Sequence, residues 1–183
     1  MMLVKLLQPN LVLGGPVTLI TPDMLEQYYL KGLILDVDET LVPWHHSEVS
    51  EQLSDWIEQL KNSPIALCLV SNNLSQERIG SIAKSLDLPY LIGAGKPSRR
   101  KLKKALEQMD VPASSVAMVG DRLFTDVLAG NRLGLFTILV EPMVEDNQTY
   151  KNWTHWVRNL EIGISRLIGV SFKPQHNFTQ VDK

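Results

Sequence analysis

Residues 34–41 read Ile-Leu-Asp-Val-Asp-Glu-Thr-Leu, and this stretch decides the fold class of the chain. An apolar run typical of a buried strand ends here in two carboxylates, Asp36 and Asp38, with Thr40 two residues further on. Neighbouring carboxylates disfavour each other's ionisation, so a nearby cation is expected. Mg²⁺, which binds one or two carboxylates together with substrate phosphate, is the simplest such cation. Taken alone, the stretch also fits a strand that ends in an ordinary acidic turn.

Three later segments place further polar side chains after apolar runs or in the loops that leave them. They are Val70-Ser71-Asn72-Asn73, Gly95-Lys96-Pro97 and the run from Gly120-Asp121 to Asp126. In an open parallel sheet the loops after the strands gather at the carboxyl edge, where ligands bind. We therefore expect these side chains to form one site.

Apolar runs and helical periodicities alternate along the chain. Strands are predicted at 32–37, 65–70, 91–92, 115–119 and 135–140, and helices at 22–30, at 48–61, after Ser75, after Ser98 and at 124–133. This alternation predicts an α/β fold, a doubly wound parallel sheet covered on both faces. We divide the chain into an N-terminal extension with one helix (1–30), a core (31–170) and a polar tail (171–183).

The composition is consistent with one small single-domain protein. A chain of 183 residues fits a single domain, and 18 basic against 20 acidic residues give no overall attraction to nucleic acid. Cys68, the single cysteine, excludes an internal disulfide and is interpreted as a buried, inert thiol. Because no secretory signal and no run of ~18 apolar residues is seen, we expect a cytoplasmic protein.

The chain resembles the haloacid dehalogenase-like (HAD) hydrolases, and among them the YqeG-type class IIIA phosphatases. Relatives of that subfamily include phosphatidylglycerophosphate phosphatases. The resemblance spans roughly residues 30–140, with Glu39 where Asn is more usual, and it is carried by Asp36-x-Asp38-x-Thr40, Ser71, Lys96 and Gly120-Asp121-x-x-x-x-Asp126. It implies a Rossmann-like core with strand order 3-2-1-4-5. Residues 41–70 and 74–95 leave no room for the cap domain that many members insert.

The resemblance also implies roles for the motif residues. Asp36 is the nucleophile that forms an aspartyl-phosphate, and Asp38 is the general acid and then the base. Mg²⁺ is held by Asp36, the backbone carbonyl of Asp38 and Asp121. Substrate phosphate is bound by Thr40, Ser71, Asn72 and Lys96.

Some roles stay open at this point. Asp126 either orients Lys96 or a metal-bound water, or is a helix acid placed near the positive end of a helix dipole. We interpret His45 and His46 as a solvent-facing pair in the loop after Thr40, rather than as a metal site. The apolar residues near both ends, from Leu3 to Leu7 and from Trp153 to Ile168, either lie on a membrane surface or pack on the core.

The favoured function is a Mg²⁺-dependent phosphatase acting on phosphatidylglycerophosphate, peripheral at the inner face of a membrane. An uncapped site suits a substrate too large to enclose, or else a cap lent by another subunit. The basic run 99–104 fits an anionic phospholipid surface, although a solvated helix face explains it equally well. The alternatives are the same chemistry on a soluble sugar phosphate, nucleotide or phosphoprotein, and a non-catalytic binding scaffold.

Overall fold

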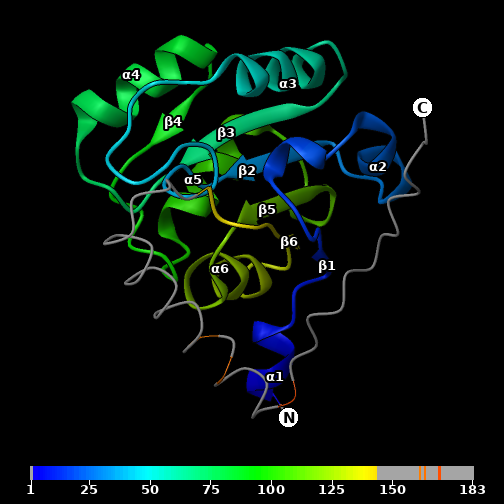
Figure 1. The fold of residues 1–183 in the computed structure, drawn as a ribbon. Helices are drawn as coiled ribbons and strands as arrows, with labels where there is room; N and C mark the ends of the chain where they lie inside the picture. Colours follow the sequence, from blue (N-terminus) through cyan, green and yellow to red (C-terminus); the bar gives the residue numbers. More distant parts are fainter. Residues whose placement is uncertain (1, 144–160, 162, 164–168, 170–183) are drawn as a thin grey trace.

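One parallel sheet of six strands organises the part of the chain that the structure, a computed structural model, describes: residues 2–143 together with 161, 163 and 169 (Figure 1). The strand order is β1-β6-β5-β2-β3-β4. The strands are β1 (Leu11–Val12), β2 (Gly32–Leu35), β3 (Ala66–Val70), β4 (Tyr90–Leu91), β5 (Val116–Gly120) and β6 (Phe136–Leu139). The predicted α/β doubly wound fold is confirmed, and so is the predicted order of its five strands.

Both faces of the sheet are covered, because the central strands are apolar at every position. Every residue of β2 and β5 is buried. One face packs against α2 (Pro22–Gln27), α3 (Glu51–Lys61) and α4 (Gln76–Leu86), and the other against α5 (Arg100–Met109) and α6 (Leu128–Asn131). Cys68 lies in the second of these cores, where burial raises the pKa of its thiol to about 11 and keeps it protonated.

Short polar side chains set the starts of three helices. The predicted caps Thr21 and Ser75 are confirmed and Ser50 is a third, whereas the predicted cap Ser98 is wrong: the N-cap of α5 is Arg99, which makes no side-chain capping bond. The hydroxyls of Thr21, Ser50 and Ser75 each accept a hydrogen bond of 3.2 Å from a backbone N–H three residues on. The predicted helix at 124–133 is different in detail. The chain first forms a π-helical turn (η3, Leu123–Val127) and only then the short α6. Single π-helical turns are frequent at functional sites.

The N-terminal segment holds more structure than the one predicted helix. It forms α1 (Met2–Leu7), β1, a 3₁₀ turn (η1, Val17–Leu19) and α2, and β1 extends the sheet by pairing with β6. Leu7 is buried, so this end of the chain packs on the core. The residues from Trp153 to Ile168 and the tail 171–183 lie outside the described residues, except 161 and 163.

Asn131 joins this segment to the core. Its side-chain amide donates to the backbone carbonyls of Lys5 (3.4 Å), Leu6 (2.8 Å) and Gln8 (2.9 Å), and its oxygen accepts from Thr137 (3.1 Å). A two-residue strand contributes few ladder bonds, so the attachment of β1 depends on contacts of this kind. None of the helices in the described residues is long and apolar enough to cross a membrane.

Replacing Asn131 with Ala should therefore loosen the N-terminal segment. The substitution leaves part-buried carbonyls without their donor, which lowers the free energy of unfolding by about 1–3 kcal/mol. Urea unfolding followed by circular dichroism measures this loss, with Asn62→Ala on the exposed end of α3 as the control. An unchanged midpoint for Asn131→Ala would show that β1 is held by other contacts.

Candidate active site

The pairing of β2 with β5 brings together two carboxylates that are 85 residues apart in the sequence. Leu35 faces Val119 across this pair, and the backbone N–H of Asp36 donates to the carbonyl of Val119 at 3.0 Å. Asp36 therefore leaves the sheet beside Asp121, which directly follows β5. Both lie at the carboxyl edge, where the sequence predicts the site.

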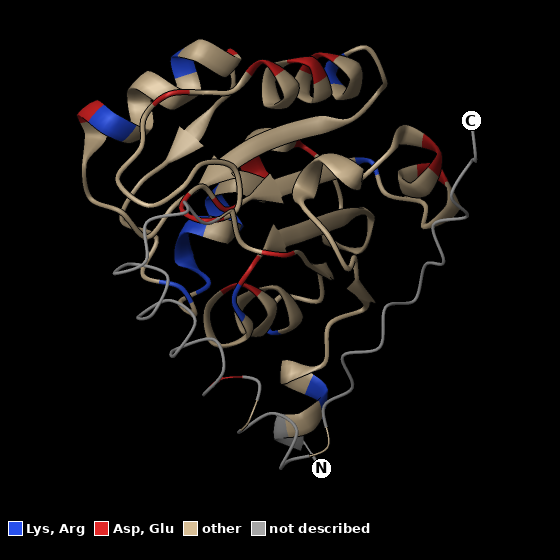
Figure 2. Ribbon diagram, viewed as in Figure 1, with Lys and Arg blue, Asp and Glu red and all other residues tan. Residues whose placement is uncertain are grey.

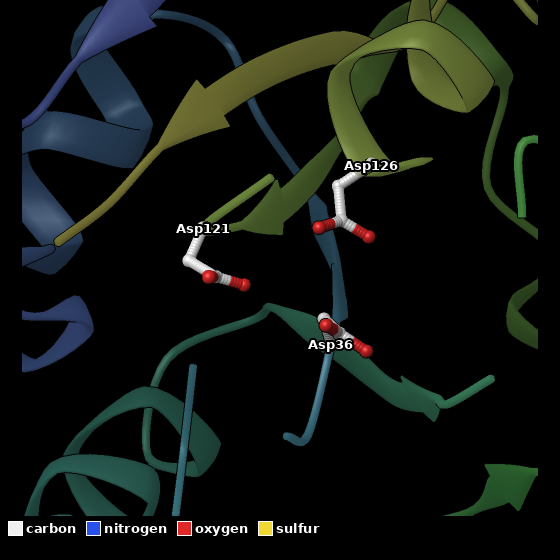
Figure 3. A group of neighbouring side chains, drawn as sticks. All are labelled: Asp36, Asp121 and Asp126. Carbon is white, nitrogen blue, oxygen red and sulfur yellow. The ribbon is translucent and has the colours of Figure 1, made fainter. Parts of the chain in front are cut away.

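Asp126, from the π-helical turn, joins these two residues to form a cluster of three carboxylates (Figure 3). One oxygen of each side chain lies within 4.8 Å of the others. All three residues are buried, and so is Lys96. The Lys96 ammonium lies 2.6 Å from Asp36 Oδ1 and 2.7 Å from Asp126 Oδ1, so it bridges the cluster from one side.

Burial dominates the electrostatics of this cluster. It raises the pKa of Asp36 to about 7 against the opposing effect of Lys96, and Asp126 raises it further. The pKa of Asp121 is raised well above its usual range by burial and by three neighbouring carboxylates, including Glu39. Burial disfavours the charged form of Lys96, but Asp126 and Asp36 outweigh this and raise its pKa above the ordinary value. Lys96 is thus a permanent cation.

The cluster fits a divalent cation. When all three carboxylates are ionised, one ammonium leaves two negative charges uncompensated in a buried place, and a bound cation would favour that ionised state. All the available donors are carboxylate oxygens, which suit hard ions such as Mg²⁺. Asp36 and Asp121 remain the expected ligands, because both oxygens of Asp126 are engaged, one by Lys96 and the other by the backbone N–H of Arg122.

Asp38 faces a different environment from Asp36, although only one residue separates them. Its Oδ1 accepts a hydrogen bond of 2.6 Å from Arg78, and its Oδ2 accepts one of 3.3 Å from the hydroxyl of Ser71. Ser71 in turn accepts a bond from the backbone N–H of Asn73. Sequence reasoning missed Arg78, which lies on α4, 40 residues after Asp38, and belongs to none of the motifs.

Asn72 and Thr40, both predicted to bind phosphate, support other site residues in this structure. The side-chain oxygen of Asn72 accepts from the backbone N–H of Lys96 (2.7 Å), and its amide donates to the carbonyl of Lys96 (3.3 Å). Asn72 therefore fixes the loop that carries the lysine. Thr40 is fully buried and donates to Asp121 at 3.4 Å. Contact of either residue with phosphate remains a prediction.

The sequence left two roles open for Asp126, and its contacts agree with the first of them, the orientation of Lys96. One oxygen pairs with Lys96, and the other accepts from the backbone N–H of Arg122 at 3.2 Å. Gly120 makes room for this arrangement, since a Cβ there would lie 2.4 Å from the Asp126 carboxyl. Because Asp126 also lies in the first turn after β5, the favourable helix-dipole contact is present as well.

A cavity of about 460 Å³ opens over these residues. Beyond the motif residues, it is lined by five side chains that sequence reasoning did not place in the site: Glu39, Trp44, Leu74, Arg122 and Thr125. Trp44 is 44% exposed and Leu74 is 81% exposed, so the mouth of the cavity carries two large apolar side chains. His45 and His46 follow Trp44 in the loop and are not part of the carboxylate cluster.

Comparison with known proteins places this chain in a family. A family model described as HAD-hydrolase-like matches residues 93–160. The probable phosphatase YqeG of Bacillus subtilis is 36% identical over 128 residues, which are 70% of this chain and 74% of that protein. The chain belongs to the HAD-like hydrolases. It is a phosphatase of the YqeG type, so the scaffold alternative is set aside.

Two further proteins are similar to this chain, one in sequence and one in fold. Phosphatidylglycerophosphate phosphatase 1 (chloroplastic/mitochondrial) of Arabidopsis thaliana is 29% identical over 161 residues, 83% of this chain but 46% of that protein. The chain thus spans about half the length of this relative. A cobalt-bound deoxy-D-mannose-octulosonate 8-phosphate phosphatase from Haemophilus influenzae has the same fold, with a TM-score of 0.50, 14% identity, and coverage of 78% of this chain and 95% of that one.

The HAD core of this chain is uncapped, as the sequence predicts. Residues 36–65 between β2 and β3 contain one helix, α3, and residues 71–89 between β3 and β4 contain only α4. Neither of these two segments holds an inserted domain.

Divalent-metal binding should compete with protons at Asp36. Because the pKa of Asp36 is raised to about 7, this carboxyl is mostly protonated at pH 6 and mostly ionised at pH 8. The apparent Mg²⁺ dissociation constant should therefore rise by about tenfold or more from pH 8 to pH 6, with proton release on binding. Isothermal titration calorimetry in buffers of different ionisation enthalpy measures both effects. Affinity independent of pH over this range would contradict the arrangement.

Proposed function

We propose that this HAD phosphatase is a Mg²⁺-dependent phosphomonoester hydrolase that works through an aspartyl-phosphate on Asp36. We further propose that its substrate is phosphatidylglycerophosphate, which it converts to phosphatidylglycerol. The observation that carries the mechanism is the Asp36 carboxylate, which lies buried at the base of an open cavity between Lys96 and Asp121. A nucleophilic carboxylate and an anionic phosphate repel each other, so nearby cations are needed to offset the repulsion. Lys96 is one such cation, and a metal ion at Asp121 would be another.

In the first step, an oxygen of Asp36 forms a bond to phosphorus while the bond from phosphorus to the leaving oxygen breaks. Asp38 gives its proton to that oxygen, so the product leaves as an alcohol. In the second step, water attacks the aspartyl-phosphate, Asp38 takes a proton from the water, and Asp36 is released as a carboxylate. Asp36, Asp121 and the backbone carbonyl of Asp38 would hold a Mg²⁺ ion, which when bound would stabilise the charge on the transferring phosphoryl group.

Lys96 and Ser71 contribute to phosphate binding in this proposal. Lys96 already lies 2.6 Å from Asp36, so its ammonium is close enough to meet a phosphoryl oxygen that bonds to that carboxylate. Ser71 lies between Asp38 and the loop of Asn73, and its hydroxyl is able to reorient toward phosphate. Asn72 and Asp126 act through Lys96, one on its backbone and the other on its ammonium.

Four features support a phospholipid substrate. The relatives include a phosphatidylglycerophosphate phosphatase, and the uncapped cavity admits a headgroup still attached to its lipid. Leu74 and Trp44 place exposed apolar surface at the cavity mouth, where acyl chains or a bilayer surface would lie. The basic residues at the start of α5 are exposed apart from the half-buried Lys101, and anionic headgroups attract such clusters (Figure 2).

A soluble phosphomonoester is the second candidate, and the size of the cavity favours it. A volume of about 460 Å³ falls in the range of pockets that hold small metabolites. The chemistry at Asp36 would be the same, and only the surroundings of the leaving group would differ. Substrate comparison therefore separates the two candidates.

Changing Asp36 to Asn should remove nearly all turnover on any substrate. The amide is a poor nucleophile of nearly the same shape, so the fold survives while the covalent step is lost. Steady-state phosphate release should fall at least 10³-fold, with an unchanged thermal unfolding curve. A variant that keeps a tenth of the native rate would refute the covalent mechanism, because losing that step should cost far more than about 1.4 kcal/mol.

Changing Leu74 to Ser should lower the preference for lipid substrate. If Leu74 contacts acyl chains or the bilayer surface, its loss removes about 1.5–3 kcal/mol of apolar burial, or roughly 10- to 100-fold. The measurement is the ratio of kcat/KM for phosphatidylglycerophosphate in mixed micelles to kcat/KM for a soluble aryl phosphate. The ratio should fall by that factor for Leu74→Ser.

Tyr29→Ser is the matched control for this comparison. Tyr29 is 83% exposed but precedes β2, at the edge of the sheet opposite the cavity, so its removal should leave the ratio unchanged. If the native protein shows no preference for the lipid over soluble esters, the second candidate holds. An equal fall for both variants would indicate a non-specific effect of surface hydrophobicity.

A further inference from the structure

Arg78 forms the shortest contact that Asp38 makes to a side chain, although it belongs to none of the HAD motifs. Its Nη1 donates to Asp38 Oδ1 at 2.6 Å. Both side chains are largely buried, with exposures of 13% for Arg78 and 10% for Asp38. An ion pair sheltered from water in this way is far stronger than one on the surface. The ion pair with Arg78 is therefore strong enough to fix the orientation of the Asp38 carboxyl.

The contacts of Arg78 hold it between two elements. Its backbone N–H is bonded to the N-cap hydroxyl of Ser75, which anchors it in the first turn of α4. Its Nη2 donates to the carbonyl of Pro43 at 3.4 Å, in the loop that follows Asp38. With Ser71 on the second oxygen, the Asp38 carboxyl is held by donors from β3–α4 on both of its oxygens.

Stability alone does not account for this arrangement. The Nε of Arg78 is buried and has no hydrogen-bond partner among the described residues. An unsatisfied buried donor costs free energy, and a native structure that retains one calls for an explanation. Replacing a buried ion pair by apolar side chains of similar volume is often neutral or stabilising. Orienting the carboxyl that transfers protons is a reason to keep the pair.

We propose that Arg78 is a positioning residue that acts through Asp38, and this inference rests on the acid role proposed for Asp38. When Asp38 gives its proton to the leaving oxygen, the bond from phosphorus to that oxygen breaks and negative charge forms on the Asp38 carboxyl. In the structure Asp38 accepts hydrogen bonds on both of its oxygens, which is the ionised form that this proton transfer produces. Arg78 stabilises that form and holds the carboxylate in place until it accepts a proton from the attacking water. Arg78 itself exchanges no proton, since a guanidinium stays charged throughout.

The dependence of rate on the leaving group tests this role. An alkyl phosphate such as glycerol 1-phosphate needs a proton on its leaving oxygen, whereas 2,4-dinitrophenyl phosphate releases a stable anion without one. Arg78→Gln should lower kcat/KM for glycerol 1-phosphate by about 10²-fold, the usual contribution of a positioned acid. For 2,4-dinitrophenyl phosphate the fall should be at most about threefold. The parameter kcat/KM is used because it reports the phosphoryl-transfer half-reaction and not the later hydrolysis.

Further variants separate positioning from a structural effect. Arg78→Lys keeps the charge and should recover part of the loss on the alkyl substrate. Lys84→Gln, an exposed change on the same helix, should alter neither substrate. In an Asp38→Asn background, Arg78→Gln should cost nothing further on the alkyl substrate, because the group through which it acts is absent.

Equal losses on the two substrates, or additive losses of Arg78→Gln and Asp38→Asn, would overturn the proposal. These outcomes differ from a failure of the proposed function. Glycerol 1-phosphate carries no acyl chain, so the result does not depend on a lipid substrate. A failure of the covalent mechanism would appear instead as turnover by Asp36→Asn.

Discussion

The paired contacts of the Lys96 ammonium with Asp36 and Asp126 are the interaction on which the site depends. Three carboxylates cannot remain ionised in a buried space unless cations compensate them. Lys96 supplies the cation that belongs to the protein, and a divalent metal bound at the cluster would supply the rest. Two other residues make this contact possible. Asn72 clamps the lysine backbone, and Gly120 leaves the space into which Asp126 turns.

Two neighbouring carboxylates acquire different tasks because their surroundings differ. Asp36 faces an ammonium and the cluster that fits a metal ion, whereas Asp38 faces a guanidinium and a hydroxyl. The partner of Asp36 follows β4 in the chain, whereas the partners of Asp38 follow β3. Environments that separate two titratable groups in this way are the usual means of assigning acid and nucleophile roles.

Much of the fold follows from the sequence, because the strands are apolar runs buried on both faces and the helix starts carry Thr or Ser caps. The edge strand β1 escaped prediction, since Leu11–Val12 is too short to show a period. It is defined by Asn10, Asn131 and Thr137, which meet only in the folded chain. The π-helical turn likewise has no sequence signal of its own, although it carries Asp126.

The motif residues were predicted because their order and spacing along the chain resemble those of a known family. The side chains that contact them in the folded protein were not predicted. Arg78 looks like any basic residue in the first turn of a helix, and Leu74 and Trp44 look like ordinary loop residues. Their positions depend on how α4 and the loop after β2 pack across the carboxyl edge. Glu39, which stands where the family resemblance leads us to expect Asn, lines the cavity and adds negative charge beside Asp121.

The covalent role of Asp36 is the central claim, and trapping the intermediate tests it most directly. The protein is mixed with Mg²⁺ and a phosphomonoester labelled with ³²P, quenched in acid within milliseconds and digested with a protease. We predict acid-stable, alkali-labile label on the peptide that contains Asp36, at a level that falls when turnover is complete. Label that is absent, or that resides on another residue, would contradict the account.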